Sequence, residues 1–199
     1  MSFLDPTTIL TTFGYIGLFL AVFVETGLLV GVMLPGDSLL FVAGFFASTG
    51  HLQIAFVVIV AFIAAVIGDS VGYMLGKKYG PAVFAREESF FFKKSYVTRA
   101  QTFYEKHGTK TIVLARFMPI VRTFAPLFAG IGGMKYSLFL MYNILGGALW
   151  TLSMSLFGYF LGKTVPNADK YVLPIVIGLV VVSMLPGVIK LIMSRNVKK

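Results

Sequence analysis

The sequence predicts an all-α integral membrane protein: an inverted repeat of two re-entrant helical hairpins, each followed by a transmembrane helix, plus a C-terminal transmembrane helix. Three observations lead to this prediction. Of the 199 residues, 57% are hydrophobic and only 13% are charged, about half the charged share of a soluble domain. Two apolar segments are interrupted by prolines and charged residues. Other apolar segments are long enough to cross a bilayer, which takes about 20 residues.

The first broken segment covers residues 13–50. A helix is expected over residues 7–24, where Glu25 interrupts it, and a second break follows at residues 35–37 (Pro-Gly-Asp). The segment is too long for one span, and its halves are short for two. We therefore expect a helix–break–helix that enters and leaves at the same membrane face. Such a backbone is tolerated only where it is buried in protein or lines water.

The first complete span is expected over residues 54–76. No lysine or arginine occurs before residue 77, whereas residues 77–110 contain eight, and four more lie near the C-terminus. Because basic residues gather on the cytoplasmic side of a membrane, we place both groups in the cytoplasm. Residues 80–109 are expected to form an amphipathic segment at the membrane surface. No nucleic-acid-binding motif accompanies these basic residues, so we expect no nucleic acid as a partner.

The second half of the chain is expected to repeat the first. Residues 111–134 form another broken segment, residues 138–162 a complete span and residues 171–193 the last span. The sequence Gly-Tyr-Met-Leu-Gly-Lys at 72–77 recurs as Gly-Tyr-Phe-Leu-Gly-Lys 86 residues later, as does an Ala-Gly pair. One membrane domain (1–199) would thus hold repeat one at about 10–79 and repeat two at about 110–165. Inverted repeats with discontinuous helices recur among secondary transporters.

Four ionisable residues lie within the broken segments: Glu25, Asp37, Arg116 and Arg122. An arginine at the bilayer centre costs about 2.5 to 17 kcal/mol, so each arginine needs a wet cavity, an acidic partner or an anionic ligand. Pro119 breaks the helix between the two arginines and lets both face one pocket. We interpret the set as an anion site in which guanidinium groups bind a phosphate or carboxylate head group.

The acids of this set have two expected roles. They would pair with the arginines when the site is empty. Burial disfavours an ionised carboxylate, so Glu25 or Asp37 could also carry a proton, and protonation would release an arginine for the anion. Proton coupling is therefore a hypothesis at this point. The alternative is that the four charges only pin the two broken segments together.

Weaker candidates lie in the complete spans. Asp69 is expected to pair with Lys77 or Tyr73, and Asn143 to hydrogen-bond a neighbouring helix. We expect no metal site and no cofactor, because the chain has no cysteine and its two histidines fall in loops. The chain also lacks the short motifs of metalloproteases and serine hydrolases, so we expect a protein that is not an enzyme.

Four motifs together resemble a known family. They are residues 23–27 (Phe-Val-Glu-Thr-Gly), 34–40 (Leu-Pro-Gly-Asp-Ser-Leu-Leu), 103–108 (Phe-Tyr-Glu-Lys-His-Gly) and 115–126 (Ala-Arg-Phe-Met-Pro-Ile-Val-Arg-Thr-Phe-Ala-Pro). From about residue 10 to residue 190 the chain resembles the DedA family of bacterial inner-membrane proteins, also called SNARE-associated or VTT-domain proteins. The resemblance implies a role in membrane homeostasis and in recycling undecaprenyl phosphate. It places the essential acids and arginines at Glu25, Asp37, Arg116 and Arg122.

The resemblance further implies dependence on the proton motive force in some members, and phospholipid scrambling in eukaryotic relatives. We therefore expect an inner-membrane flippase for an anionic lipid, undecaprenyl phosphate in particular, with the lipid and protons as partners. A proton-coupled small-ion or drug exchanger and a phospholipid scramblase remain alternatives. A membrane lipid phosphatase is less favoured, since that chemistry needs a histidine or metal near the phosphate. The sequence is compatible with a homo-oligomer.

Overall fold

The computed structural model describes residues 6–28, 36–85, 112–113, 116–117, 119–165, 170, 174–175 and 178. Five helices occupy most of this part: α1 (Pro6–Gly27), α2 (Gly36–Ser48), α3 (Ile54–Ala85), α6 (Pro119–Ile131) and α7 (Tyr136–Thr164). Within the described ranges no strand occurs. Residues Ile54–Gly80 of α3 and all of α7 are long and apolar enough to cross a membrane. The all-α prediction is thereby confirmed for the described part.

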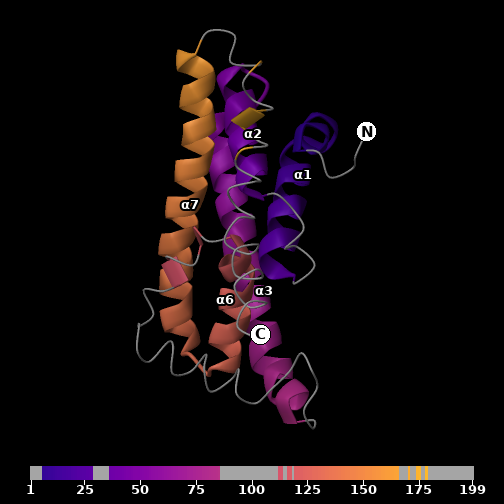
Figure 1. Ribbon diagram of the computed structural model, residues 1–199, viewed down its shortest axis with the longest axis vertical. Coiled ribbons are helices and arrows are strands. Elements are labelled where there is room, and N and C mark those ends of the chain that lie inside the picture. The colour runs from indigo at the N-terminus through magenta and orange to yellow at the C-terminus, as the bar shows by residue number, and fades with distance from the viewer. Residues whose placement is uncertain are drawn as a thin grey trace, which may run out of the picture.

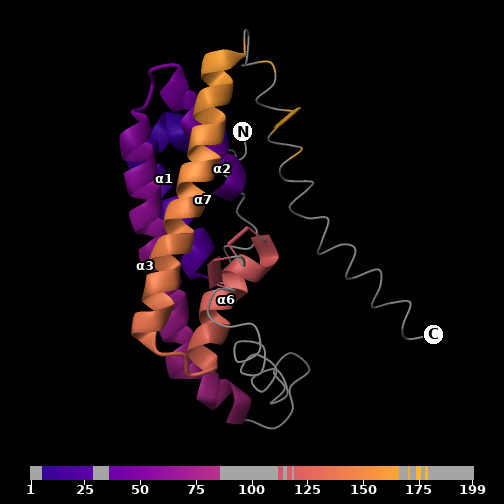
Figure 2. The same ribbon diagram turned by 90° about the vertical axis from the view of Figure 1, so that its left-hand side faces the viewer.

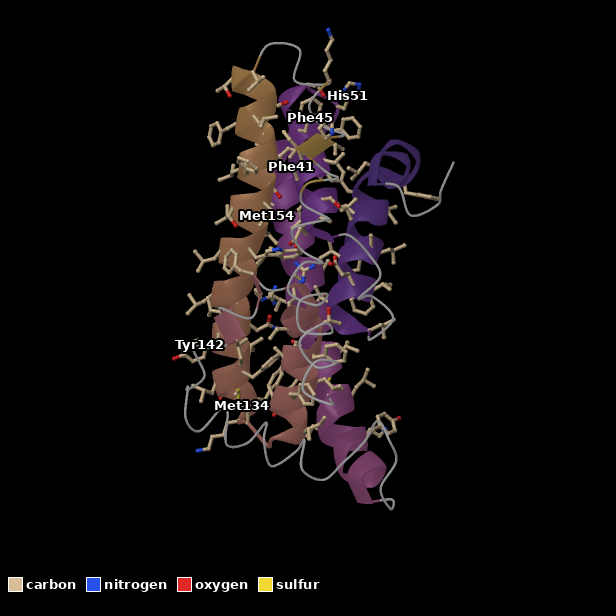
Figure 3. All side chains as sticks on the ribbon, in the orientation of Figure 1. Phe41, Phe45, His51, Met134, Tyr142 and Met154 are labelled. Atoms are coloured by element: carbon tan, nitrogen blue, oxygen red, sulfur yellow. The ribbon has the colours of Figure 1, made fainter. Side chains whose placement is uncertain are left out.

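The long helices α3 and α7 run antiparallel along the molecule, and each shorter helix lies beside only one half of their length (Figure 1). The helices α1 and α2 lie beside one half of this pair, and α6 lies beside the other half (Figure 2). His51, just after α2, lies near one end of the molecule, and Met134, just after α6, lies toward the other, although α3 extends further in that direction (Figure 3). The helices α2 and α6 therefore begin near the middle and run toward opposite ends.

Two predicted boundaries were wrong. Glu25 does not interrupt the first helix, which begins at Pro6 and continues through Glu25 to Gly27, with a kink at Gly14 where φ is 54°. The helix expected to end with the first span at residue 76 continues to Ala85, although its apolar part ends at Gly80, so the segment predicted at 80–109 begins as helix. Lysine is a good helix former, and a lysine pair at a membrane surface therefore does not stop a helix.

The second half agrees more closely with the prediction. The helix α6 begins at Pro119, because proline suits the first turn of a helix, where its missing N–H needs no partner. The span predicted at 138–162 is found at Tyr136–Thr164. The predicted surface segment beyond Ala85 and nearly all of the last span predicted at 171–193 lie outside the described residues.

Each short helix packs against the long helix of the other half of the chain, and glycines line both contacts. A Cβ atom added to Gly44 of α2 or Gly158 of α7 would overlap the backbone of the opposite helix. The same holds for Gly130 of α6 and Gly76 of α3. Small residues let helix backbones approach closely within a membrane. Gly44 and Gly130 are 86 residues apart, so this repeated glycine lies at a close helix contact in each half.

These contacts make a direct prediction on α3. Gly76→Ala is expected to lower the free energy of unfolding by about 1–3 kcal/mol, because the new Cβ would overlap the Leu127 backbone and overpacking costs that much. Gly72→Ala is the matched control one turn away, where the nearest atom would be Pro126 Cβ at 3.5 Å. Thermal unfolding in detergent measures both. An equal loss in the two variants would contradict the close contact of α3 with α6.

Candidate functional site

Arg122 of α6 lies between two carboxylates that come from two other helices. Its Nη1 donates a hydrogen bond to Oδ1 of Asp37 at 2.8 Å, and its Nη2 donates to Oε1 of Glu25. The Arg122 side chain is 3% exposed, that of Glu25 3% and that of Asp37 19%. The predicted pairing of this arginine with both acids is present. We call Arg122, Glu25 and Asp37 the Arg122 cluster.

Gly36, at the start of α2, provides a second hydrogen-bond donor to Glu25. Its backbone N–H donates to Oε1 of Glu25 at 3.0 Å. A Cβ at residue 36 would overlap the Glu25 carboxylate, so any larger residue here would displace that acid from its present position. The N-terminal end of a helix carries a partial positive charge, and here it stabilises an acid from the neighbouring helix.

Trp150 is a member of the site that the sequence reasoning missed. Its indole Nε1–H donates to Oδ1 of Asp37 at 2.7 Å, and its ring lies 4.5 Å from Cζ of Arg122. The residue is fully buried in α7. One signal could have identified it: it is the only tryptophan in the chain and lies in mid-span, whereas membrane proteins usually place tryptophan at the interfaces.

Arg116, just before α6, forms a separate polar cluster. Its Nη2 donates to Oδ2 of Asp69 on α3 and to Oδ1 of Asn143 on α7. The amide of Asn143 in turn donates to the Val66 carbonyl at 3.1 Å, the bond to a neighbouring helix that was predicted for it. Arg116, Asp69 and Asn143 are almost completely buried. We call these three residues the Arg116 cluster.

The partner predicted for Asp69 was wrong. The Tyr73 hydroxyl donates to the Met134 carbonyl, and Lys77 is exposed at the end of the apolar part of α3. Asp69 pairs with Arg116 instead. A carboxylate inside the protein needs a charged partner that is also buried. That partner comes from 47 residues along the chain.

The two arginines, which were expected to face one pocket, have different carboxylate partners. Arg116 is paired with Asp69 and not with Glu25 or Asp37. Asn143 and Trp150, which contact the two clusters, are seven residues apart on α7, hence on nearly the same face and about 10 Å apart along its axis. Pro119 begins α6 between the two arginines. The structure therefore forms two neighbouring clusters, each with its own guanidinium.

The two clusters contain one more negative than positive charge, and some of their buried polar atoms have no hydrogen-bond partner. Among the described residues, three carboxylates (Glu25, Asp37 and Asp69) face two guanidinium groups in the interior. Within the same residues, several buried atoms have no hydrogen-bond partner: Nε of both arginines, Nη1 of Arg116, Oε2 of Glu25 and Oδ1 of Asp69. Free N–H groups can bind the oxygens of an anion, and an excess carboxylate can hold a proton. In Figure 3 side-chain nitrogen and oxygen atoms gather midway between His51 and Met134.

The histidines and metal-binding groups add no further site in the described part. His51 is exposed in the turn after α2, where its ring Nδ1 lies 2.8 Å from Oγ1 of Thr49, and His107 lies outside the described residues. No group of three or more histidine, cysteine, aspartate or glutamate side chains that could hold a metal ion occurs in the described ranges.

Comparison with known proteins gives consistent matches. The family model of the VTT domain matches residues 34–160. "Protein DedA" of Escherichia coli (strain K12) is 49% identical over 184 residues, which cover 92% of this chain and 84% of that protein. An uncharacterised membrane protein of Mycobacterium leprae (strain TN) is 46% identical over 168 residues, 84% of this chain and 75% of that protein. "Inner membrane protein YqjA" of E. coli (strain K12) is 34% identical over 157 residues, 79% and 71% of the two chains. No solved structure shows a significant match.

Proposed function

We propose that this chain, which belongs to the DedA family of VTT-domain membrane proteins, moves an anionic lipid, undecaprenyl phosphate in particular, across the bacterial inner membrane. One observation carries the proposal. Two guanidinium groups, 2% and 3% exposed, are held among apolar helices by carboxylates, and both keep buried N–H groups without a partner in the described part. Intramembrane charges of this kind mark substrate or ion pathways by default.

The chemistry of the substrate fits such a site. A polyprenyl phosphate has a compact anionic head and a long apolar tail, so only the head needs a polar path while the tail stays in lipid. Guanidinium groups bind phosphate oxygens through short, charge-assisted hydrogen bonds. The two carboxylates on Arg122 occupy its Nη1 and Nη2, the donors that a phosphate would use. In the resting state the two acids thus occupy the Arg122 donors that would bind the lipid head.

The helix arrangement supports a route to the bilayer centre. We propose that α1 with α2, and the segment that ends in α6, are re-entrant hairpins, with residues 77–110 and the C-terminus in the cytoplasm. The helices α2 and α6 begin near the middle of the molecule (Figures 1 and 3). Their N-terminal ends carry partial positive charge. Discontinuous helices of transporters direct such ends at anionic groups near the midplane.

The charge balance of the interior supports proton coupling. Glu25 and Asp37 share the single guanidinium of Arg122, so among the described residues the three carboxylates exceed the two arginines by one negative charge. A buried charge without a full partner is costly. We propose that one proton enters with the lipid, at Glu25 or Asp37, and frees Arg122 for the phosphate. Asp69 already compensates Arg116, so it plays no part in this exchange.

Reconstituted vesicles test this proposal. Purified protein is placed in liposomes with labelled undecaprenyl phosphate, a labelled zwitterionic phospholipid or the uncharged polyprenol, and the label that crosses the bilayer is measured. We expect the phosphate lipid alone to cross, and a proton gradient directed along its movement to accelerate it. Equal movement of every lipid would indicate a scramblase. Movement of the phosphate lipid that ignores the gradient would remove the proton coupling.

A further inference from the structure

Trp150 contacts both Asp37 and Arg122. In the proposed function these two residues separate when the phosphate binds to Arg122. Its N–H donates to Oδ1 of Asp37 at 2.7 Å, and the Nη1 of Arg122 donates to that same oxygen at 2.8 Å. The face of the indole ring lies 4.5 Å from the guanidinium carbon. The Asp37 Oδ1 therefore accepts from two donors, and the Trp150 side chain contacts both the carboxylate and the guanidinium.

This geometry has a consequence when Arg122 exchanges its ligand. If a phosphate takes the Nη1 of Arg122, Asp37 loses one donor but keeps the indole N–H. A buried acceptor that loses all its donors is strongly destabilised, so the second donor lowers the cost of the exchange. The ring can meanwhile stay against the guanidinium face, because a cation–π contact leaves the N–H edges free.

We propose that Trp150 is a positioning residue of the anion site: it keeps Asp37 hydrogen-bonded and Arg122 oriented while a phosphate monoester head replaces the carboxylates on Arg122. This inference rests on the proposed function and adds a residue to its mechanism. Such a head offers oxygens that can meet both Nη1 and Nη2. The uncharged alcohol with the same tail offers no such charge and leaves the cluster in its resting state.

The protein contains its own reporter for this step. Trp150 is the only tryptophan in the chain, so the tryptophan fluorescence of the purified protein comes entirely from this site. Titration with farnesyl phosphate in detergent is expected to change the emission saturably. Farnesol, the uncharged control, is expected to leave it unchanged. In Arg122→Gln, farnesyl phosphate is also expected to have no effect. Binding of tritiated farnesyl phosphate is measured in parallel.

Variants of Trp150 separate its two contacts. Trp150→Phe keeps an aromatic ring against Arg122 but loses the N–H, and is expected to weaken farnesyl phosphate binding about tenfold. Trp150→Leu loses both contacts and is expected to weaken binding about a hundredfold. Phe139→Leu, the matched control, truncates another fully buried aromatic of α7, whose ring contacts are to Tyr73 and Tyr136. It is expected to lose stability but to bind normally.

The outcomes distinguish this inference from the proposed function. Binding by the wild type, with no binding by Arg122→Gln and graded losses in Trp150→Phe and Trp150→Leu, supports both. The role of Trp150 is overturned, and the anion site left intact, if Trp150→Phe and Trp150→Leu bind tritiated farnesyl phosphate normally. The same holds if the wild type binds tritiated farnesyl phosphate without a change in emission. Absence of tritium binding in the wild type overturns the proposed function and the inference with it.

Discussion

Arg122→Ala is expected to lower lipid-phosphate transport at least about a hundredfold. The guanidinium supplies Nη1 and Nη2 to the two carboxylates at rest, and the same donors to the phosphate in the proposed bound state. Each hydrogen bond to a charged group contributes about 1.5–3 kcal/mol, so the loss of two exceeds two powers of ten. Arg122→Lys should recover part of the rate, because an ammonium restores the charge but not the planar fork. The transport rates of the wild type, Arg122→Ala and Arg122→Lys are measured as movement of the labelled lipid in proteoliposomes.

A companion variant separates function from folding. Arg122→Ala alone leaves the buried Glu25 and the partly exposed Asp37 without their guanidinium, and removing one partner of a buried ion pair costs about 3–5 kcal/mol. The triple variant Glu25→Gln, Asp37→Asn, Arg122→Gln has no charge in this cluster, and the two amides keep the shapes of the acids they replace. We expect it to unfold near the wild-type temperature and yet to transport nothing. Transport at the wild-type rate by the triple variant would show that these charges only hold the helices together.

Asp69→Ala is expected to lower the free energy of unfolding by about 3–5 kcal/mol. It leaves Arg116 buried with Asn143 as its remaining hydrogen-bond partner among the described residues. The double variant Asp69→Leu, Arg116→Met should regain most of the loss, since buried ion pairs can be replaced by apolar side chains at little cost. Thermal unfolding in detergent measures each protein.

The control for this series is Lys163→Ala at the exposed end of α7. A surface substitution of this kind changes stability by at most about 0.5 kcal/mol. If Asp69→Ala were no less stable than Lys163→Ala, the buried pair would be contradicted. Transport by the stable double variant then has a clear meaning: a rate near zero places Arg116 on the lipid route, and a normal rate assigns it to the structure alone.

Local chemistry explains what could be predicted from the sequence. Proline and glycine act on the backbone at their own positions, so the start of α6 at Pro119 and the break before α2 at Gly36 were predictable. Buried charges in apolar segments are rare enough to identify Glu25, Asp37 and the arginines as a set. The 86-residue repeat likewise contains Gly44 and Gly130, which lie at close helix contacts.

Partners that are distant along the chain could not be predicted in this way. Asp69 and Arg116 are 47 residues apart, and Asp37 and Trp150 are 113 apart. Which side chains meet across such distances depends on the rotation and depth of packed helices, and no local pattern encodes either. The end of α3 was missed for a related reason. A polar boundary at the membrane surface ends an apolar run, but it does not end a helix whose residues still favour that conformation.

The most direct test of the central claim is an electron cryomicroscopy structure of the protein with bound undecaprenyl phosphate. We expect phosphate oxygens within about 3 Å of the Arg122 nitrogens, with Asp37 still hydrogen-bonded to Trp150. A lipid head that lies only at the membrane surface, while Arg122 remains paired with Glu25 and Asp37, would contradict it.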